Sequence, residues 1–274
     1  MTPLSVREAL TTARTSGVDR LDAQLLLASC AGQSRSWLIA HGEALLTPAQ
    51  ATRFIGWLAR RAAGEPLAYL FGEKEFHGLV LQVDARVLVP RPDTETLVDW
   101  ALELLATRPD GATRVVDLGT GSGAIALALK HAQPGADVTA LDASGGALEV
   151  ARANAAALRL DVRLVSGNWW SAVQGERFDI AVSNPPYIAL HDPHLAALTH
   201  EPAIALTAGI DGLDALRHLI DHAAAHLRPG GWLLLEHGHD QGPAVQGLLF
   251  QSGFARVETR CDLAGHWRCS GAQV

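Results

Sequence analysis

The segment from Val115 to Leu129 constrains the fold of this chain more than any other. It begins with the strand-like run Val115–Leu118, continues through glycines spaced G-x-G-x-G at 119, 121 and 123, and enters the alanine- and leucine-rich run Ala124–Leu129. Glycine is needed where the backbone takes positive φ angles or approaches a ligand closely, and alanine and leucine are good helix formers. The segment therefore predicts a strand, a glycine loop and a helix.

The apolar runs on either side extend this unit into a sheet. From about Asp93 the chain reads as helix, strand, helix, strand, helix, strand, strand, helix, strand. The further strands are expected at 137–141, 162–165, 178–183 and 232–235. One later helix has an apolar face at helical spacing, formed by Leu213, Leu216, Ile220, Ala223 and Leu227. This alternation is typical of an α/β fold with a mostly parallel sheet covered on both faces.

The chain before this region has a different character. Residues 4–70 read as helices, among them Val6–Ala13, Leu21–Ala28 and Pro48–Ala63, the last with its proline just inside the start. A short strand pair is expected on either side of Gly78.

We therefore predict three parts. A small all-helical domain spans 1–71, a β-hairpin linker spans 72–90, and the α/β domain spans 91–274.

Three polar features each follow a predicted strand of the α/β domain. They are the glycine loop, Asp142 at the end of the second strand, and Asn184 after the strand 178–183. Ligands of open parallel sheets bind at the carboxyl ends of the strands. The sequence therefore predicts that these features meet at one ligand site.

Asp117 and Asp142 indicate what that ligand is. Asp117 comes directly before the glycines, where a carboxylate would repel a pyrophosphate but favour an ammonium or sulfonium group. The spacing also differs from the G-x-G-x-x-G of dinucleotide binders. These observations favour S-adenosylmethionine (SAM) over NAD. Asp142 stands where an adenosine ribose would offer its hydroxyls, although Asp is also a preferred helix N-cap.

The third strand leads into Asn168, Trp169 and Trp170. Adenine has a flat face and a polar edge, and an Asn beside an aromatic ring suits both. Either tryptophan, or neither, could provide that ring, since both are equally suited to a protein core.

The tetrapeptide Asn184-Pro185-Pro186-Tyr187 predicts the reacting centre. Two prolines remove two N–H donors and fix two φ angles, which leaves carbonyl acceptors, an Asn amide and an aromatic face. Such a corner suits a planar –NH2 group, which brings two donors. The alternative is an ordinary proline turn with Tyr187 as packing.

Composition and residue spacing argue against several classes of protein. With 48% hydrophobic and 19% charged residues the chain can form a core, and a formal net charge of −7 without a Lys/Arg stripe argues against tight nucleic-acid binding. Cysteines at 30, 261 and 269 form no CxxC pair, which favours a reducing cytoplasm. No signal peptide or membrane span is expected. Histidines at 191, 194 and 200 lack metal-site spacing, so no metal is expected, and no base that would activate a serine is identifiable.

Together these motifs resemble the class I SAM-dependent methyltransferases, and more narrowly the release-factor glutamine N5-methyltransferases (HemK/PrmC type). The narrower resemblance rests on the stretches Gly72–Leu79, Val87–Glu95 with its P-R-P-D-T-E, Arg228–Trp232 and Glu236–Gly238. It runs nearly end to end, although the helical region matches only weakly. One departure is that the family usually has Asp where this chain has Asn168.

The resemblance implies a Rossmann-like fold and a reaction. The expected cofactor-binding residues are Asp117, Gly119, Thr120, Gly121, Ser122, Gly123, Asp142, Asn168, Trp169 and Asn184, and the expected catalytic residues are Asn184, Pro185, Pro186 and Tyr187. The acceptor would be the glutamine of the Gly-Gly-Gln motif of class 1 peptide-chain release factors, bound by a monomeric cytoplasmic enzyme. The helical domain would recognise that partner. Alternatives are an adenine-N6 nucleic-acid methyltransferase and a ribosomal-protein glutamine methyltransferase.

Overall fold

The computed structural model describes residues 4–108 and 113–274, and the chain divides into two units. The first is Met1–Gly72 and the second is Glu73–Val274. The first has one hydrophobic core and the second has two.

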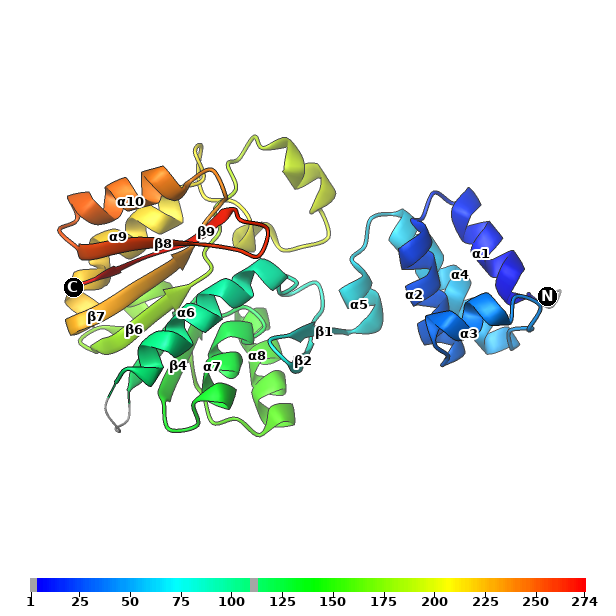
Figure 1. Ribbon diagram of the computed structural model, residues 1–274, viewed down its shortest axis with the longest axis horizontal. Helices are drawn as coiled ribbons and strands as arrows, with labels where there is room; N and C mark the ends of the chain where they lie inside the picture. Colours follow the sequence, from blue (N-terminus) through cyan, green and yellow to red (C-terminus); the bar gives the residue numbers. More distant parts are fainter. Residues whose placement is uncertain (1–3, 109–112) are drawn as a thin grey trace. The chain divides into compact units, whose positions relative to one another are not determined.

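The first unit is all-helical, as predicted (Figure 1). Its helices are α1 (Val6–Thr15), α2 (Arg20–Ala31), α3 (Arg35–Ala40), α4 (Pro48–Ala62) and α5 (Leu67–Phe71). Capping boxes at Ser5 and Thr47 begin α1 and α4, because each hydroxyl accepts a hydrogen bond from the first-turn backbone and a Glu or Gln side chain reaches back. Leu26, Leu27 and Phe54 are fully buried between the helices.

The second unit begins with the predicted hairpin. Strands β1 (Glu73–Phe76) and β2 (Leu79–Gln82) pair antiparallel around a two-residue turn with positive φ at both His77 and Gly78. The Asn154 side chain binds the backbone N–H and C=O of Gln82 at 2.7 and 3.0 Å. The hairpin thus packs against the α/β part of its own unit.

The sheet has seven strands in the order β5-β4-β3-β6-β7-β9-β8. Its strands are β3 (Arg114–Leu118), β4 (Asp137–Asp142), β5 (Arg163–Ser166), β6 (Phe178–Ser183), β7 (Leu227–Glu236), β8 (Ala255–Cys261) and β9 (Trp267–Gln273). The first five are parallel, as predicted, and β9 and β8 pair antiparallel at one edge.

Two differences from the sequence reading concern the end of the chain. The sequence did not predict α10 (Gly242–Gln251), β8 or β9. Strand β7 is also longer than the predicted 232–235, because its Pro-Gly-Gly segment continues the strand through an irregularity opposite Phe178 and Ile180.

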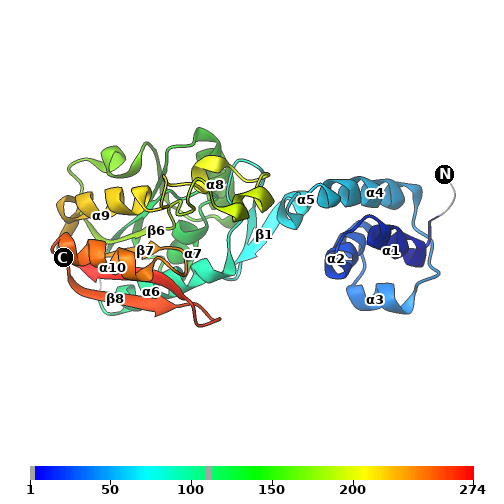
Figure 2. The same ribbon diagram turned by 90° about the horizontal axis from the view of Figure 1, so that it is seen from above.

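Helices cover both faces of the sheet (Figures 1 and 2). On one face lie α6 (Glu95–Ala106), α7 (Ala124–Ala132) and α8 (Gly145–Leu158), and on the other lie α9 (Asp214–His226) and α10. Successive strand residues point to opposite faces of the sheet. Val115 therefore belongs to the core beneath α6, α7 and α8, and Val116 to the core beneath α9 and α10.

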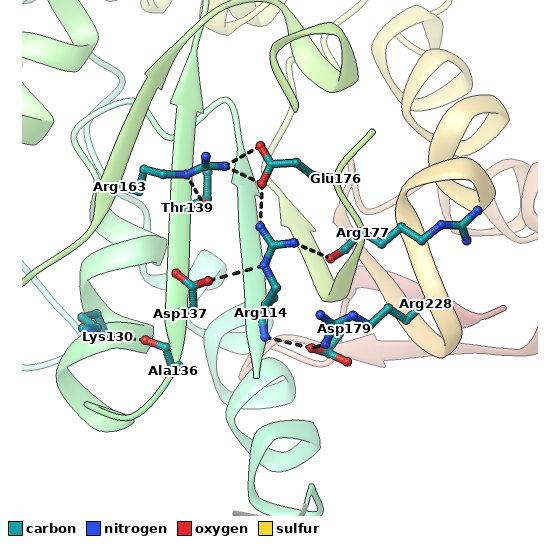
Figure 3. Close-up of polar contacts among 10 residues, drawn as sticks. All are labelled: Arg114, Lys130, Ala136, Asp137, Thr139, Arg163, Glu176, Arg177, Asp179 and Arg228. Atoms are coloured by element: carbon teal, nitrogen blue, oxygen red, sulfur yellow. Dashed lines mark hydrogen bonds and ion pairs between the residues drawn. The ribbon is translucent and has the colours of Figure 1, made fainter. Parts of the chain in front are cut away.

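A polar network ties the strands together at the amino-terminal edge of the sheet (Figure 3). The buried carboxylate of Asp179, at the start of β6, accepts hydrogen bonds from Nη1 of Arg108 at 3.0 Å and Nη1 of Arg228 at 2.9 Å. It also accepts the backbone N–H of Arg114 at 2.8 Å. Arg114 in turn pairs with Glu176 at 2.5 Å.

We expect Asp179→Ala to lower the free energy of unfolding by about 3–5 kcal/mol, because it leaves two partly buried guanidinium groups without their shared carboxylate. Asp137→Ala is the matched control. Its half-exposed carboxylate lies 3.4 Å from Nε of Arg114 and should contribute only about 0–1 kcal/mol. Urea unfolding measures both, and equal losses in the two variants would contradict the central role of Asp179.

Candidate active site

A cavity of about 480 Å³ lies at the carboxyl edge of the parallel strands. Of the residues predicted from the sequence, Gly119, Thr120, Gly121, Ser122, Asp142, Asn168, Trp169, Asn184 and Pro186 line it. Asp117, Gly123, Pro185 and Tyr187 do not. The volume is in the range of pockets that hold small molecules.

The glycine loop forms one wall and is held to strand β4. The backbone N–H groups of Gly119 and Thr120 both donate to the carbonyl of Leu141 at 2.9 Å, and that of Gly121 donates to Oδ2 of Asp142 at 2.9 Å. Gly121 has φ 56°, and a Cβ at this position would meet no protein atom within 4 Å. A side chain there would be strained and would extend into open space beside the cavity.

Asp142 lines the cavity and does not cap the following helix. The N-cap of α8 is Ser144, whose hydroxyl accepts the N–H of Ala147 at 3.2 Å. Oδ1 of Asp142 accepts the N–H of Ser144 at 2.8 Å. Each carboxylate oxygen has a second lone pair, so Asp142 keeps acceptor capacity for a ligand hydroxyl.

The structure separates the two tryptophans. Trp169 lines the cavity and packs on the glycine loop, where a Cβ on Gly119 would come within 3.1 Å of its Cζ3. Trp170 belongs to the core, where its Nε1 donates to the carbonyl of Leu219 at 3.0 Å and its ring stacks on His226. Trp169 is therefore the aromatic residue available to a ligand.

Asp117 lies beneath the loop and away from the cavity lining. It is fully buried, and Oδ2 accepts the hydroxyl of Thr120 at 2.6 Å, while Oδ1 has no hydrogen-bond partner in the described part of the chain. Burial raises the pKa of Asp117 to about 7, against the opposing effect of the Thr120 hydrogen bond. The charge of Asp142 raises it further.

A second cavity, of about 440 Å³, adjoins the first. Both are lined by Leu88, Asn184 and Ala205, and the second also by Pro185 and Tyr187. The predicted catalytic residues thus stand where two cavities meet.

Asn184 and Pro185 present acceptors at this junction. Nδ2 of Asn184 donates to Oγ1 of Thr94 at 3.1 Å, which leaves Oδ1 without a hydrogen-bond donor among residues 4–108 and 113–274. The carbonyl of Pro185 is likewise unpaired within those ranges. The Tyr187 hydroxyl donates to Oε1 of Glu236 at 3.2 Å. An incoming –NH2 group would find two acceptors here.

The segment after Tyr187 forms a wall that the sequence did not predict. Its buried Glu201 accepts the N–H of Val89 at 3.0 Å and Nη2 of Arg91 at 2.5 Å. Arg91 belongs to the P-R-P-D-T-E run, and its charge is a signal from which a buried acidic partner could have been predicted. Ile204 and Ala205, a few residues after Glu201, line the first cavity.

Neither a metal site nor a membrane-spanning helix is found in the described residues. No group of three or more His, Cys, Asp or Glu side chains there is arranged to hold a metal ion. Within the same part of the chain, no helix is long and apolar enough to cross a bilayer.

The chain matches known proteins over nearly its whole length. Two family models match it, the methyltransferase small domain over residues 94–251 and the PrmC N-terminal domain over residues 5–72. A release factor glutamine methyltransferase from Xylella fastidiosa (strain Temecula1) is 50% identical over 258 residues, 93% of each chain. One from Burkholderia pseudomallei (strain K96243) is 48% identical over 95% of this chain and 94% of its own.

A solved structure agrees in fold. A methyltransferase from Pyrococcus furiosus superposes with a TM-score of 0.56 at 22% identity, covering 78% of this chain and 98% of its own.

Asp117→Asn tests the buried carboxyl. The folded-state pKa of about 7 lies above the ordinary 3.8, so stability from this group is fully present below pH 3.8 and is lost as pH rises to about 7. Between about pH 5 and 7 the free energy of unfolding should fall with rising pH in the wild type more steeply than in the variant. The two slopes should differ by about 1.4 kcal/mol per pH unit. Urea titrations measure it, and identical slopes would contradict the raised pKa.

Proposed function

This chain belongs to the family of release factor glutamine methyltransferases, and we propose that it transfers a methyl group from SAM to the side-chain amide nitrogen of a release-factor glutamine. The proposed acceptor is the glutamine of the Gly-Gly-Gln motif in class 1 release factors. The observation that carries the proposal is the pair of unpaired acceptors, Asn184 Oδ1 and the Pro185 carbonyl, at the junction of two cavities.

The first cavity fits SAM better than a dinucleotide. A pyrophosphate would need free backbone N–H groups in the glycine loop. Those of Gly119, Thr120 and Gly121 already donate to Leu141 and Asp142. The cavity is also lined by the acidic Asp142 and Asp214, which favour a cationic ligand. Trp169 and Asn168 offer the ring and the polar edge that adenine requires.

When bound, SAM supplies an electrophilic methyl group, and the residues at the junction prepare the nucleophile. An amide nitrogen reacts poorly because its lone pair is delocalised into the carbonyl. Asn184 Oδ1 and the Pro185 carbonyl each accept one amide N–H, which fixes the nitrogen and directs its lone pair toward the first cavity. Positioning of this kind contributes about 7–11 kcal/mol in favourable cases.

Tyr187 lines the second cavity and covers the acceptor amide. An aromatic face near a cationic centre stabilises it by about 0.5–2 kcal/mol. After transfer the nitrogen is acidic enough to release its proton to water or a carbonyl, so no strong general base is required beforehand.

The two alternative substrates are less well supported. The relatives above are named for release factors, and neither an adenine nor a ribosomal protein appears in those names. The net charge of −7 gives no electrostatic attraction to nucleic acid. Release factors act in the cytoplasm, which agrees with three free cysteines.

We also propose that the helical unit docks the release factor. It has its own core, and it carries seven arginines and five acidic residues in a chain that is acidic overall. All residues lining the two cavities come from position 86 onward, so methyl transfer leaves the helices free for recognition.

Radiolabelled SAM tests the reaction. Label should move to purified class 1 release factor, and a release factor whose motif glutamine is replaced by alanine should stay unlabelled. Transfer to ribosomal protein or DNA, with none to release factor, would replace this proposal by one of the alternatives.

Asn184→Ala should lower the methyl-transfer rate at saturating substrates by more than about 10–100-fold. The variant lacks the acceptor Oδ1, so one N–H of the substrate amide stays buried without a partner. SAM affinity, measured by calorimetry, should change little. Asn168→Ala is the matched control, since Asn168 lines only the first cavity and should mainly weaken SAM binding. Near-normal transfer by Asn184→Ala would mean that Asn184 is only a turn residue.

A polypeptide that begins at Glu73 should bind SAM with nearly the affinity of the whole protein and methylate full-length release factor slowly at limiting factor concentrations. A short peptide containing the Gly-Gly-Gln motif should be methylated equally by both proteins. If the shortened protein matches the whole one on the full-length factor, the helical unit has no docking role.

A further inference from the structure

Glu236 is the last residue of β7 and lies next to the junction without lining either cavity. Its side chain is 1% exposed. Oε1 accepts the hydroxyl of Tyr187 at 3.2 Å, and Oε2 has no hydrogen-bond partner from residues 4–108 or 113–274. A buried carboxyl with so few partners is costly to the fold, which calls for a functional reason.

Thr94 connects this carboxyl to Asn184. Its hydroxyl oxygen accepts Nδ2–H of Asn184 at 3.1 Å, and its own proton favours the ionised form of Glu236. Oε2 of Glu236 has no other partner in the described residues, so it is the atom that would accept that proton. Three sequence motifs, P-R-P-D-T-E, N-P-P-Y and E-H-G, thus meet in one buried polar group.

The direction of these hydrogen bonds decides whether Asn184 turns its oxygen or its NH2 group toward the substrate amide. An Asn side chain can turn by 180° and exchange its oxygen with its NH2 group, which would present donors to the donors of the substrate amide. A threonine hydroxyl can donate to Asn Oδ1 or accept from Asn Nδ2. If the Thr94 hydroxyl donates its hydrogen bond to an ionised Glu236, Thr94 can only accept a hydrogen bond from Asn184. Nδ2 of Asn184 must then face Thr94, and Oδ1 must face the cavity.

We propose that Glu236 is a positioning residue for methyl transfer, acting through Thr94 to orient the Asn184 amide and through the hydroxyl of Tyr187 to hold its ring. This inference rests on the proposed function of the junction. Glu236 touches neither substrate nor cofactor.

The role depends on the charge of Glu236 and therefore on pH. Burial raises the pKa of Glu236 to about 7, while Thr94, Tyr187 and Arg268 lower it and Asp93 raises it. Arg268 pairs with Asp262 at 3.0 Å and with Asp93 at 3.2 Å, so its charge acts on these two acids as well as on Glu236.

Tyr187, Cys269 and Arg268, which also interact with Glu236, keep their protons through neutral pH. Burial raises the pKa of Tyr187 and that of Cys269, and the acids around Arg268 raise its pKa. Below neutral pH Glu236 becomes protonated, Thr94 loses its fixed direction, and the Asn184 amide is free to turn.

Nuclear magnetic resonance tests the orientation without any substrate. The chain has only three asparagines, Asn154, Asn168 and Asn184, so ¹⁵N-asparagine labelling gives three side-chain amide pairs. The Asn184 pair, assigned by its loss in Asn184→Ala, should titrate near neutral pH in the wild type. In Glu236→Gln it should not titrate, and its protection from hydrogen exchange should fall. An unchanged Asn184 signal in Glu236→Gln would overturn the proposal.

Kinetics gives the second readout. At neutral pH Glu236→Gln should lower kcat about 10–100-fold with little change in SAM affinity, and the rise of kcat with pH should disappear. Thr94→Val should have a similar effect, Thr94→Ser should restore most activity, and adding Glu236→Gln to Thr94→Val should cause little further loss. If the losses of the two single variants add fully in the double variant, Glu236 does not act through Thr94 and the proposal is overturned.

Glu258→Gln, on the exposed face of β8, is the control and should leave kcat and its pH profile unchanged. If the wild type does not methylate release factor, the proposed function fails, while the resonance result still decides whether Glu236 orients Asn184.

Discussion

The constraint on which this site depends is the parallel register of β4, β3, β6 and β7. Asp117 stands beside Ala140 in β4 and Val182 in β6, and Val182 stands beside Leu234 in β7. The strands therefore end at one level, and the loops that follow them share one edge. A slip of one residue would turn every side chain of a strand to the other face, so two apolar cores hold this register in place.

Hydrogen bonds within the glycine loop then decide which ligand the edge can accept. The N–H groups of Gly119, Thr120 and Gly121 donate to the carbonyl of Leu141 and the carboxylate of Asp142, both in β4. What remains toward the cavity is negative charge from Asp142 and the ring of Trp169. This wall of the cavity therefore offers few free N–H groups to an anion.

The sequence predicted strands β3 to β7 and the glycine loop after β3 because those signals are local. Apolar runs, glycine spacing and the prolines after β6 each report on neighbouring residues. The hydrogen bonds that support the cavity residues were not predictable in this way. Thr94 and Asn184 are 90 positions apart in the sequence, and Val89 and Glu201 are 112 apart. Trp169 and Trp170 were indistinguishable for a related reason, since only the packing around them tells which one is buried.

Two buried acids lie behind cavity-lining side chains, Asp117 behind Thr120 of the glycine loop and Glu236 behind Tyr187. Burial raises the pKa of each to about 7, so both destabilise the fold as pH rises toward neutrality. Neutral isosteres would fit the same spaces at lower cost, yet each acid is one hydrogen bond away from a residue that lines a cavity, Thr120 in one case and Tyr187 in the other. Destabilising groups placed this close to a cavity are expected where charge or hydrogen bonding, rather than packing, is what the position requires. The fold therefore gives up stability at two points where an acid holds the hydroxyl of a cavity-lining side chain.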